Sequence, residues 1–314
     1  MLKVIFLLFI FITLKADLFT RASNLYEKKD FKKSFKLYEQ LAYAGNVDAQ
    51  YNIAIFYYNG IGVKKDKVLA FIWLSTTSKR NHKIAQNKLA YMYEKGEIPN
   101  TKNKKKALEE YLKSAKQNYD IAQLNLGMHY NQIASKDALK QAFFWYTKSC
   151  NNGNIPACNN LANMYYFGQS VKTNYKEAAK LYKKAAKAND KIAQYNLAMM
   201  YFSGEYFEYN GKKSLYWLEK SSIAGYKVAQ VKLATFYKEG NNILVDKDYK
   251  KAFFWYYQAA RQNYAPAQYY LGYLYFYGYG VKIDLKKAAY YMHTSYQNGY
   301  ENAKRFMKRK KLYY

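Results

Sequence analysis

One short pattern of small, polar and apolar positions recurs along most of the chain. Ala-Gln dipeptides stand about 36 residues apart, and Ala157-Cys158 fills the one missing register. The dipeptides are Ala49-Gln50, Ala85-Gln86, Ala122-Gln123, Ala193-Gln194, Ala229-Gln230 and Ala267-Gln268. A fixed period of this length is typical of helical repeat proteins, in which each unit packs on its neighbours.

Each dipeptide opens a stretch with helical spacing. Leu or Ile stands four positions after the Ala, Ala or Gly follows it directly, and Tyr stands eight positions after the Ala. Because these spacings fall on one face of a helix, they predict a helix that we name helix A. In most copies helix A is expected to end at a Gly, which readily adopts the left-handed conformation. The third copy instead reads Asn131-Gln132-Ile133-Ala134-Ser135, so we expect a different turn there.

A second helix, helix B, is predicted between each Gly and the next dipeptide. A small residue opens its apolar face, and a bulky apolar residue follows four positions later, as in Ala252 and Tyr256. The tryptophans stand three positions after the small residue, at Trp73, Trp145, Trp217 and Trp255. A register shared between repeats indicates a packing role for these rings and not a ligand cage.

Seven helix pairs are therefore predicted, over residues 47–300. Their expected bounds are 47–82, 83–119, 120–154, 155–190, 191–226, 227–264 and 265–300. A diverged helix pair in residues 17–46 and a basic helix in residues 301–314 are expected to cap the array. With only three prolines to interrupt helices, the sequence predicts an all-α fold and an α-solenoid.

The N-terminal residues have the pattern of an export signal. Lys3 precedes an apolar run from Val4 to Leu14, and Ala16 is a small residue suited to cleavage. The run is shorter than the roughly 20 residues that span a bilayer, so we predict a signal peptide over residues 1–16 and an exported chain that does not span the membrane. A buried first helix of the array is the alternative interpretation. In an oxidising compartment, the even cysteine count (Cys150 and Cys158) favours a disulfide.

The charge leaves two interpretations open. The formal net charge is +29, and the lysines are spread over every repeat, with a cluster at Lys304 to Lys311. A solvated basic surface is one interpretation. Attraction to an anionic partner, such as an envelope polymer, lipid head groups or an acidic protein, is the other. Export argues against nucleic acid as the partner.

The residues and spacings resemble the Sel1-like repeat, a relative of the tetratricopeptide repeat. The clearest copy runs from Ala267 to Tyr275, then through Gly278 to Val281 and Asp284 to Ala289. The chain is also similar to the bacterial Helicobacter cysteine-rich proteins, exported Sel1-like solenoids. Their paired cysteines, separated by seven residues, join helix B of one repeat to helix A of the next, and Cys150 and Cys158 have this spacing and register.

This resemblance implies a right-handed α-solenoid, a Cys150–Cys158 bridge, and a periplasmic or secreted interaction protein. Most repeats depart from it, because they carry Ser or Ala, and Gln, at the two cysteine positions. Members of that family are also described as β-lactamases or penicillin-binding proteins, which is the alternative function. No Ser is followed by Lys three positions later, and the three histidines, His82, His129 and His293, lack metal-ligand spacing. We therefore predict no catalytic residue, metal or cofactor, and favour a binding scaffold.

The candidate ligand contacts lie in helix A, three positions after the Ala. In tetratricopeptide domains, which resemble this chain, helices A line the concave face and an Asn directly before the same Leu holds a peptide backbone or terminal carboxylate. The residues here are Asn52, Lys88, Asn125, Asn160, Asn196, Lys232 and Tyr270. Amides both donate and accept, and the lysines could hold an acidic group, so we predict a protein or peptide partner. The alternative is that Asn is a common filler in an Asn-rich chain.

Overall fold

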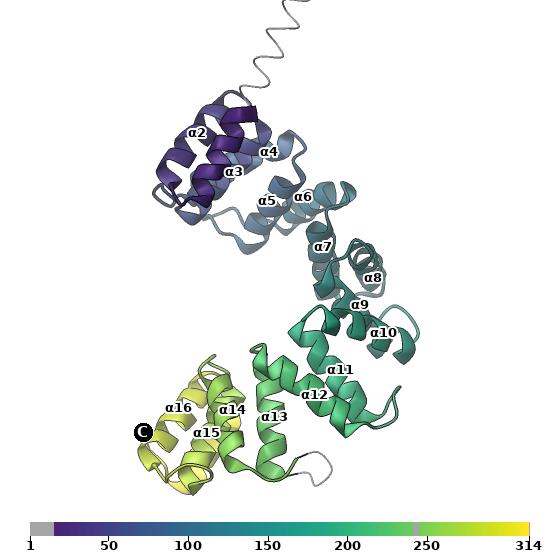
Figure 1. Cartoon of the computed structure of the whole chain (residues 1–314), viewed down its shortest axis with the longest axis vertical. Helices are drawn as coiled ribbons and strands as arrows, with labels where there is room; N and C mark the ends of the chain where they lie inside the picture. Colours follow the sequence, from purple (N-terminus) through teal and green to yellow (C-terminus); the bar gives the residue numbers. More distant parts are fainter. Residues whose placement is uncertain (1–15, 241–244, 314) are drawn as a thin grey trace, which may run out of the picture. The chain divides into compact units, whose positions relative to one another are not determined.

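The computed structural model describes residues 16–240 and 245–313, which form helices packed in consecutive pairs (Figure 1). The predicted all-α solenoid of helix pairs is confirmed. Two compact units, Met1–Asn154 and Ile155–Tyr314, contain these helices. The predicted signal peptide, apart from Ala16, lies outside the described residues.

Each repeat contributes one helix A and one helix B. The helices A are α3 (Val47–Asn59), α5 (Lys83–Lys95), α7 (Asp120–Ile133), α9 (Ile155–Phe167), α11 (Lys191–Ser203), α13 (Lys227–Glu239) and α15 (Ala265–Tyr277). The helices B are α4 (Lys67–Lys79), α6 (Lys104–Lys116), α8 (Lys136–Asn151), α10 (Tyr175–Lys187), α12 (Gly211–Ile223), α14 (Tyr249–Ala260) and α16 (Leu285–Gln297). Helical residues 16–27 and α2 (Phe31–Tyr43) precede the repeats, and α17 (Glu301–Lys310) follows them.

The turn after helix A depends on the residue that ends it. Gly60 and Gly96 take the left-handed conformation, with φ of 74° and 62°, and close α3 and α5. In the third repeat α7 continues to Ile133, and Ala134 takes the left-handed conformation at φ 55°. Ser135 then caps α8 by accepting a hydrogen bond from the Ala138 amide at 3.3 Å. The different turn expected in this repeat is thus confirmed.

Small residues in helix A let helix B approach closely. A Cβ placed on Gly127 of α7 would lie 2.4 Å from a ring carbon of Tyr146, so this position has no room for a side chain. The tryptophans pack against the same layers. Trp145 is buried in its cluster, while Trp73, Trp217 and Trp255 are half-buried against theirs. Their contacts are those of packing residues.

In five repeats the Gln after the Ala ties helix A to the end of the preceding helix. Its Nε2 donates to the carbonyl eight residues earlier, from Gln123 to Ala115 at 3.2 Å and from Gln230 to Ser222 at 3.0 Å. In the fourth repeat Cys158 stands at the Gln position, and it is disulfide-bonded, as is Cys150 eight residues before it. A covalent bond therefore occurs where other repeats have a hydrogen bond, and the predicted disulfide is confirmed.

Removing the disulfide should destabilise the protein measurably. For so short a loop, chain entropy predicts that Cys150→Ala/Cys158→Ala lowers the free energy of unfolding by about 2.5–3 kcal/mol. The pair Cys150→Ala/Cys158→Gln restores the residues found at Ala115 and Gln123, and should recover about 1 kcal/mol through the amide hydrogen bond. Urea titration without reductant measures both. Equal stability of the wild type and the double-alanine variant would contradict the prediction.

Candidate binding sites

The seven predicted contact residues, which we name the helix-A row, occupy equivalent places in their helices. Each lies directly before the buried Leu or Ile of its helix A, and each is half-buried. Asn52, Lys88 and Asn125 belong to the first compact unit, and Asn160, Asn196, Lys232 and Tyr270 belong to the second.

In the first unit one row residue bonds to a neighbouring amide and another lines a hollow. Asn125 of α7 donates from Nδ2 to Oδ1 of Asn87 in the neighbouring α5, at 2.9 Å. Asn52 lines a hollow of about 240 Å³ together with Tyr26, Tyr51 and other residues of the first helices. Neighbouring helices A therefore place polar side chains within reach of each other.

Lys88 lies against an aromatic ring and not in open solvent. Its Nζ is 3.5 Å from the centre of the Tyr58 ring, and burial lowers the pKa of Lys88. The Tyr58 hydroxyl donates to Glu97 at 2.8 Å, and Lys67 pairs with the same carboxylate oxygen at 3.1 Å. Burial, and next the hydrogen bond to Glu97, raise the pKa of Tyr58 well above its usual range, so its hydroxyl stays protonated. The ring face holds the ammonium by a cation–π contact.

The second unit repeats these contacts with different residues. Asn196 of α11 donates to Oδ1 of Asn159 in α9 at 3.1 Å. Nζ of Lys232 lies 5.3 Å from the ring centre of Phe202 and 5.0 Å from that of Phe236. The ring of Tyr270 stacks on that of Tyr256, with centres 4.9 Å apart. Along this part of the row two amides are therefore followed by a cation and then by an aromatic residue.

Two partner amides were missed by the sequence interpretation. Asn87 and Asn159 stand directly before row positions, and both accept the hydrogen bond from the next helix A. The signal was visible as polar residues at two successive positions, Asn87-Lys88 and Asn159-Asn160. Because these amides bond only after helices from different repeats stack, the spacing within one repeat could not assign them.

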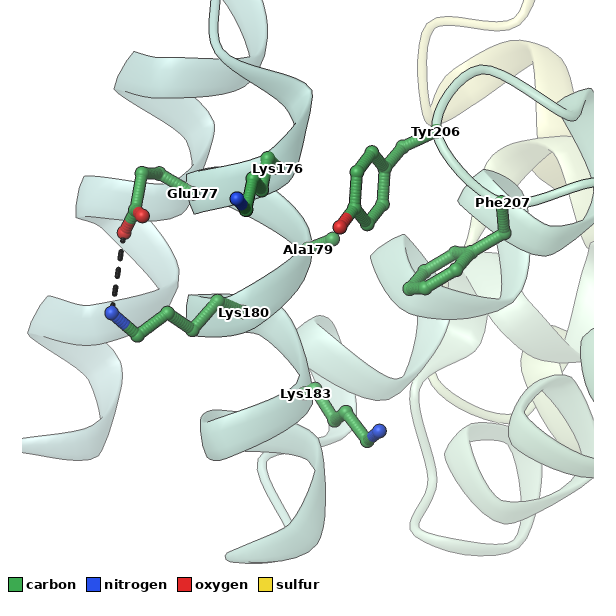
Figure 2. Close-up of a pocket in the computed structure, with 7 residues that line it drawn as sticks. All are labelled: Lys176, Glu177, Ala179, Lys180, Lys183, Tyr206 and Phe207. Carbon is green, nitrogen blue, oxygen red and sulfur yellow. Dashed lines mark ion pairs between the residues drawn. The ribbon is translucent and has the colours of Figure 1, made fainter.

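A separate groove lies in the second unit between α10 and the loop after α11. We name it the α10 groove; it has a volume of about 540 Å³. Figure 2 shows Lys176, Lys180 and Lys183 along α10 on one side, and the rings of Tyr206 and Phe207 on the other. The sequence interpretation gave no weight to these residues.

The lysine wall of the α10 groove has little carboxylate to balance it. Glu177 also lines the groove, and its Oε2 lies 3.6 Å from Nζ of Lys180, a pair largely exposed to solvent. Such an exposed pair contributes little to stability. Among the residues that the structure describes, Lys176 and Lys183 have no ion-pair partner. The groove therefore presents a net positive wall to an aromatic one.

The described residues contain neither a metal-ligand cluster nor a membrane-spanning helix. Within residues 16–240 and 245–313, no three His, Cys, Asp or Glu side chains gather in a way that could hold a metal ion. Among the helices of the same residues, none has the length and apolar character to cross a membrane.

Comparison with known families gives a match over most of the chain. The Sel1 repeat model matches residues 24–46, 47–82, 83–119, 120–154, 155–190, 191–226, 227–264 and 265–300. The segment 24–46 includes α2, which the sequence interpretation treated as part of a diverged cap.

Solved structures of similar fold come from several bacteria. A Sel1 repeat protein from Oxalobacter formigenes is 28% identical, with a TM-score of 0.73 over 94% of this chain and 87% of that chain. A protective antigen of uropathogenic Escherichia coli strains with an SLR fold is 24% identical, with a TM-score of 0.64 over 92% of this chain and 70% of that chain. Cysteine rich protein B of Helicobacter pylori is 27% identical, with a TM-score of 0.35 over 44% of this chain and 98% of that chain.

Proposed function

The chain belongs to the Sel1 repeat family, and from this premise we propose that it is an exported scaffold that binds a protein or peptide segment along the helix-A row. The observation that carries this proposal is the contact between a row residue and an amide next to the row in the preceding helix A. Asn125 reaches Asn87 at 2.9 Å, and Asn196 reaches Asn159 at 3.1 Å. Within each unit, polar groups are therefore adjacent and can meet successive groups of one ligand.

The chemistry of the row suits a peptide. An Asn side chain has two N–H donors and an acceptor oxygen. Asn125 donates to Asn87 and keeps a donor and its oxygen for a ligand. Asn196 donates to Asn159 and Asn163 and keeps its oxygen. A peptide backbone offers one donor and one acceptor at each residue. Lys88 and Lys232 add positive charge held at ring faces, which favours a segment that carries acidic groups. An acidic partner is consistent with the net charge of +29.

The disulfide supports export. Structural disulfides persist in oxidising compartments and are rare in the bacterial cytosol. The bond between Cys150 and Cys158 therefore favours the periplasm or the medium as the working compartment, in agreement with the apolar run at Val4 to Leu14.

The variant Asn125→Ala/Asn160→Ala/Asn196→Ala tests the row. The partner is first captured from an envelope extract and identified, and its dissociation constant is then measured by calorimetry. At about 0.5–1.5 kcal/mol for each hydrogen bond, the triple variant should bind at least tenfold more weakly. Circular dichroism should show a folded protein, because the three side chains are only half-buried.

The matched control changes asparagines that lie off the row. Asn59, Asn151 and Asn302 are exposed helix residues, and their change to Ala should leave the affinity within about twofold. Unchanged binding by the row variant would refute the row as the binding site.

A further inference from the structure

In the first and seventh repeats the loop between helix A and helix B lies directly on the helix that precedes the repeat. Two residues after the helix-ending Gly, the first and seventh repeats have Gly62 and Gly280, at φ of 66° and 72°. A Cβ on Gly62 would lie 2.8 Å from the backbone of Phe31, and one on Gly280 would lie 2.3 Å from the carbonyl oxygen of Tyr249. Phe31 and Tyr249 are the first residues of α2 and α14, so in these two repeats a side chain at this loop position cannot fit against the start of the preceding helix.

The fifth repeat has Tyr206 at this loop position. Tyr206 lies outside the left-handed region, and the residue is 44% exposed. The loop is fixed on both sides of it, since Glu205 accepts a hydrogen bond from the Tyr166 hydroxyl and Phe207 stacks on Tyr201, with ring centres 4.2 Å apart. Tyr206 therefore does not make the close contact seen at Gly62 and Gly280, and the α10 groove lies between its ring and α10.

The face of α10 that borders this groove also departs from the repeat. At the position of Lys180, the other helices B mostly carry exposed apolar or aromatic residues. These are Ile72, Phe144, Tyr216, Phe254 and Tyr290. At the position of Lys183 they carry residues such as Thr147 and Tyr257. At the position of Lys176 most helices B also carry lysine, so the departure lies at Lys180 and Lys183. Like charges three or four residues apart destabilise a helix, so helix stability does not account for adding these two lysines to the same face.

We propose that the α10 groove binds an extended acidic segment of a partner protein, in which acidic and apolar residues alternate. Side chains two residues apart in an extended chain point the same way and lie about 6.6–6.8 Å apart. Lys176 and Lys180 are one helical turn apart, a rise of about 6 Å. Acidic side chains can therefore face the lysines while the intervening apolar ones face Tyr206 and Phe207. A simple polyanion would use the lysine wall and leave the aromatic wall without a contact.

This site is separate from the helix-A row, because its residues come from a helix B and a loop. The result of a binding test on the α10 groove is therefore independent of the function proposed for the row.

The test measures fluorescence anisotropy with the full chain and a fluorescein-labelled peptide, Glu-Phe-Glu-Leu-Glu-Gly. We expect saturable binding that weakens at least tenfold in Lys180→Glu/Lys183→Glu and severalfold in Tyr206→Ala. The matched control is Lys250→Glu/Lys286→Glu, which changes the same charge at exposed positions of α14 and α16 and should leave affinity within twofold. Thermal melts establish that each variant is folded.

Any of the following results would overturn the proposal. One is the absence of saturable peptide binding. Another is an equal loss of affinity in the control pair, which would mean that the peptide responds only to net charge. The third is equal binding of Glu-Gly-Glu-Gly-Glu-Gly, or an unchanged affinity in Tyr206→Ala, because either would assign the groove to polyanions of any kind.

Discussion

At pH 11 the free energy of unfolding should be about 4 kcal/mol lower than at pH 8 because of three tyrosines, Tyr111, Tyr182 and Tyr256. All three are buried, and burial is the largest cause that raises the pKa of each well above its usual range. In the unfolded chain, tyrosine titrates near pH 10. Above that pH the unfolded state loses protons that the folded state keeps, so stability is full below pH 10 and falls as pH rises. One pH unit above 10 costs about 1.4 kcal/mol for each tyrosine.

The comparison protein is Tyr111→Phe/Tyr182→Phe/Tyr256→Phe. It loses hydroxyl hydrogen bonds, such as the 3.1 Å bond from Tyr111 to Glu94, but that loss applies at both pH values. Lysines also lose their charge in this range, and they do so in both proteins. The difference between the two proteins' pH responses, measured by urea titration at pH 8 and pH 11, therefore isolates the three tyrosines. An equal response in wild type and variant would show that these hydroxyls ionise in the folded protein.

The sequence predicted the fold well because one repeat constrains the next. Apolar positions such as Leu126 and small positions such as Gly127 recur in all seven repeats. An ambiguous helix assignment in one repeat is therefore settled by the other six. Even the exception was visible, since the missing Gly after α7 predicted the altered turn at Ala134. Conformational preference and hydrophobic periodicity are both visible within one repeat of about 36 residues, so they can be read from a single sequence.

The binding surfaces were predicted less completely because they depend on contacts between repeats. The position of Asn125 could be assigned, but its partner Asn87 could not, because the pairing follows from the stacking of α5 and α7. The α10 groove was missed for a related reason. Its signal is Tyr206, two residues after Gly204, where the first and seventh repeats have Gly, and this difference has meaning only once Gly280 is known to touch the start of α14.

Removing the Tyr256 side chain should be among the most damaging single changes in the protein. Tyr256 is fully buried in α14, its ring stacks on Tyr270, and its hydroxyl lies 2.9 Å from the Thr235 hydroxyl. Tyr256→Ala leaves a ring-sized cavity between three helices of the second unit, and large aromatic-to-alanine changes in cores cost about 3–5 kcal/mol. Urea titration followed by circular dichroism measures the loss.

The next residue in the chain supplies the control. Tyr257 is on the same helix but is 37% exposed, so Tyr257→Ala should cost less than about 1 kcal/mol. Tyr256→Phe keeps the ring and removes the hydroxyl, and should cost about 1 kcal/mol for the lost hydrogen bond to Thr235. The order of the three variants follows from the orientation of α14, which turns one of two adjacent tyrosines to the core and the other to solvent. Similar losses in Tyr256→Ala and Tyr257→Ala would mean that α14 packs on a different face, and the repeat register that places every helix B would then be wrong.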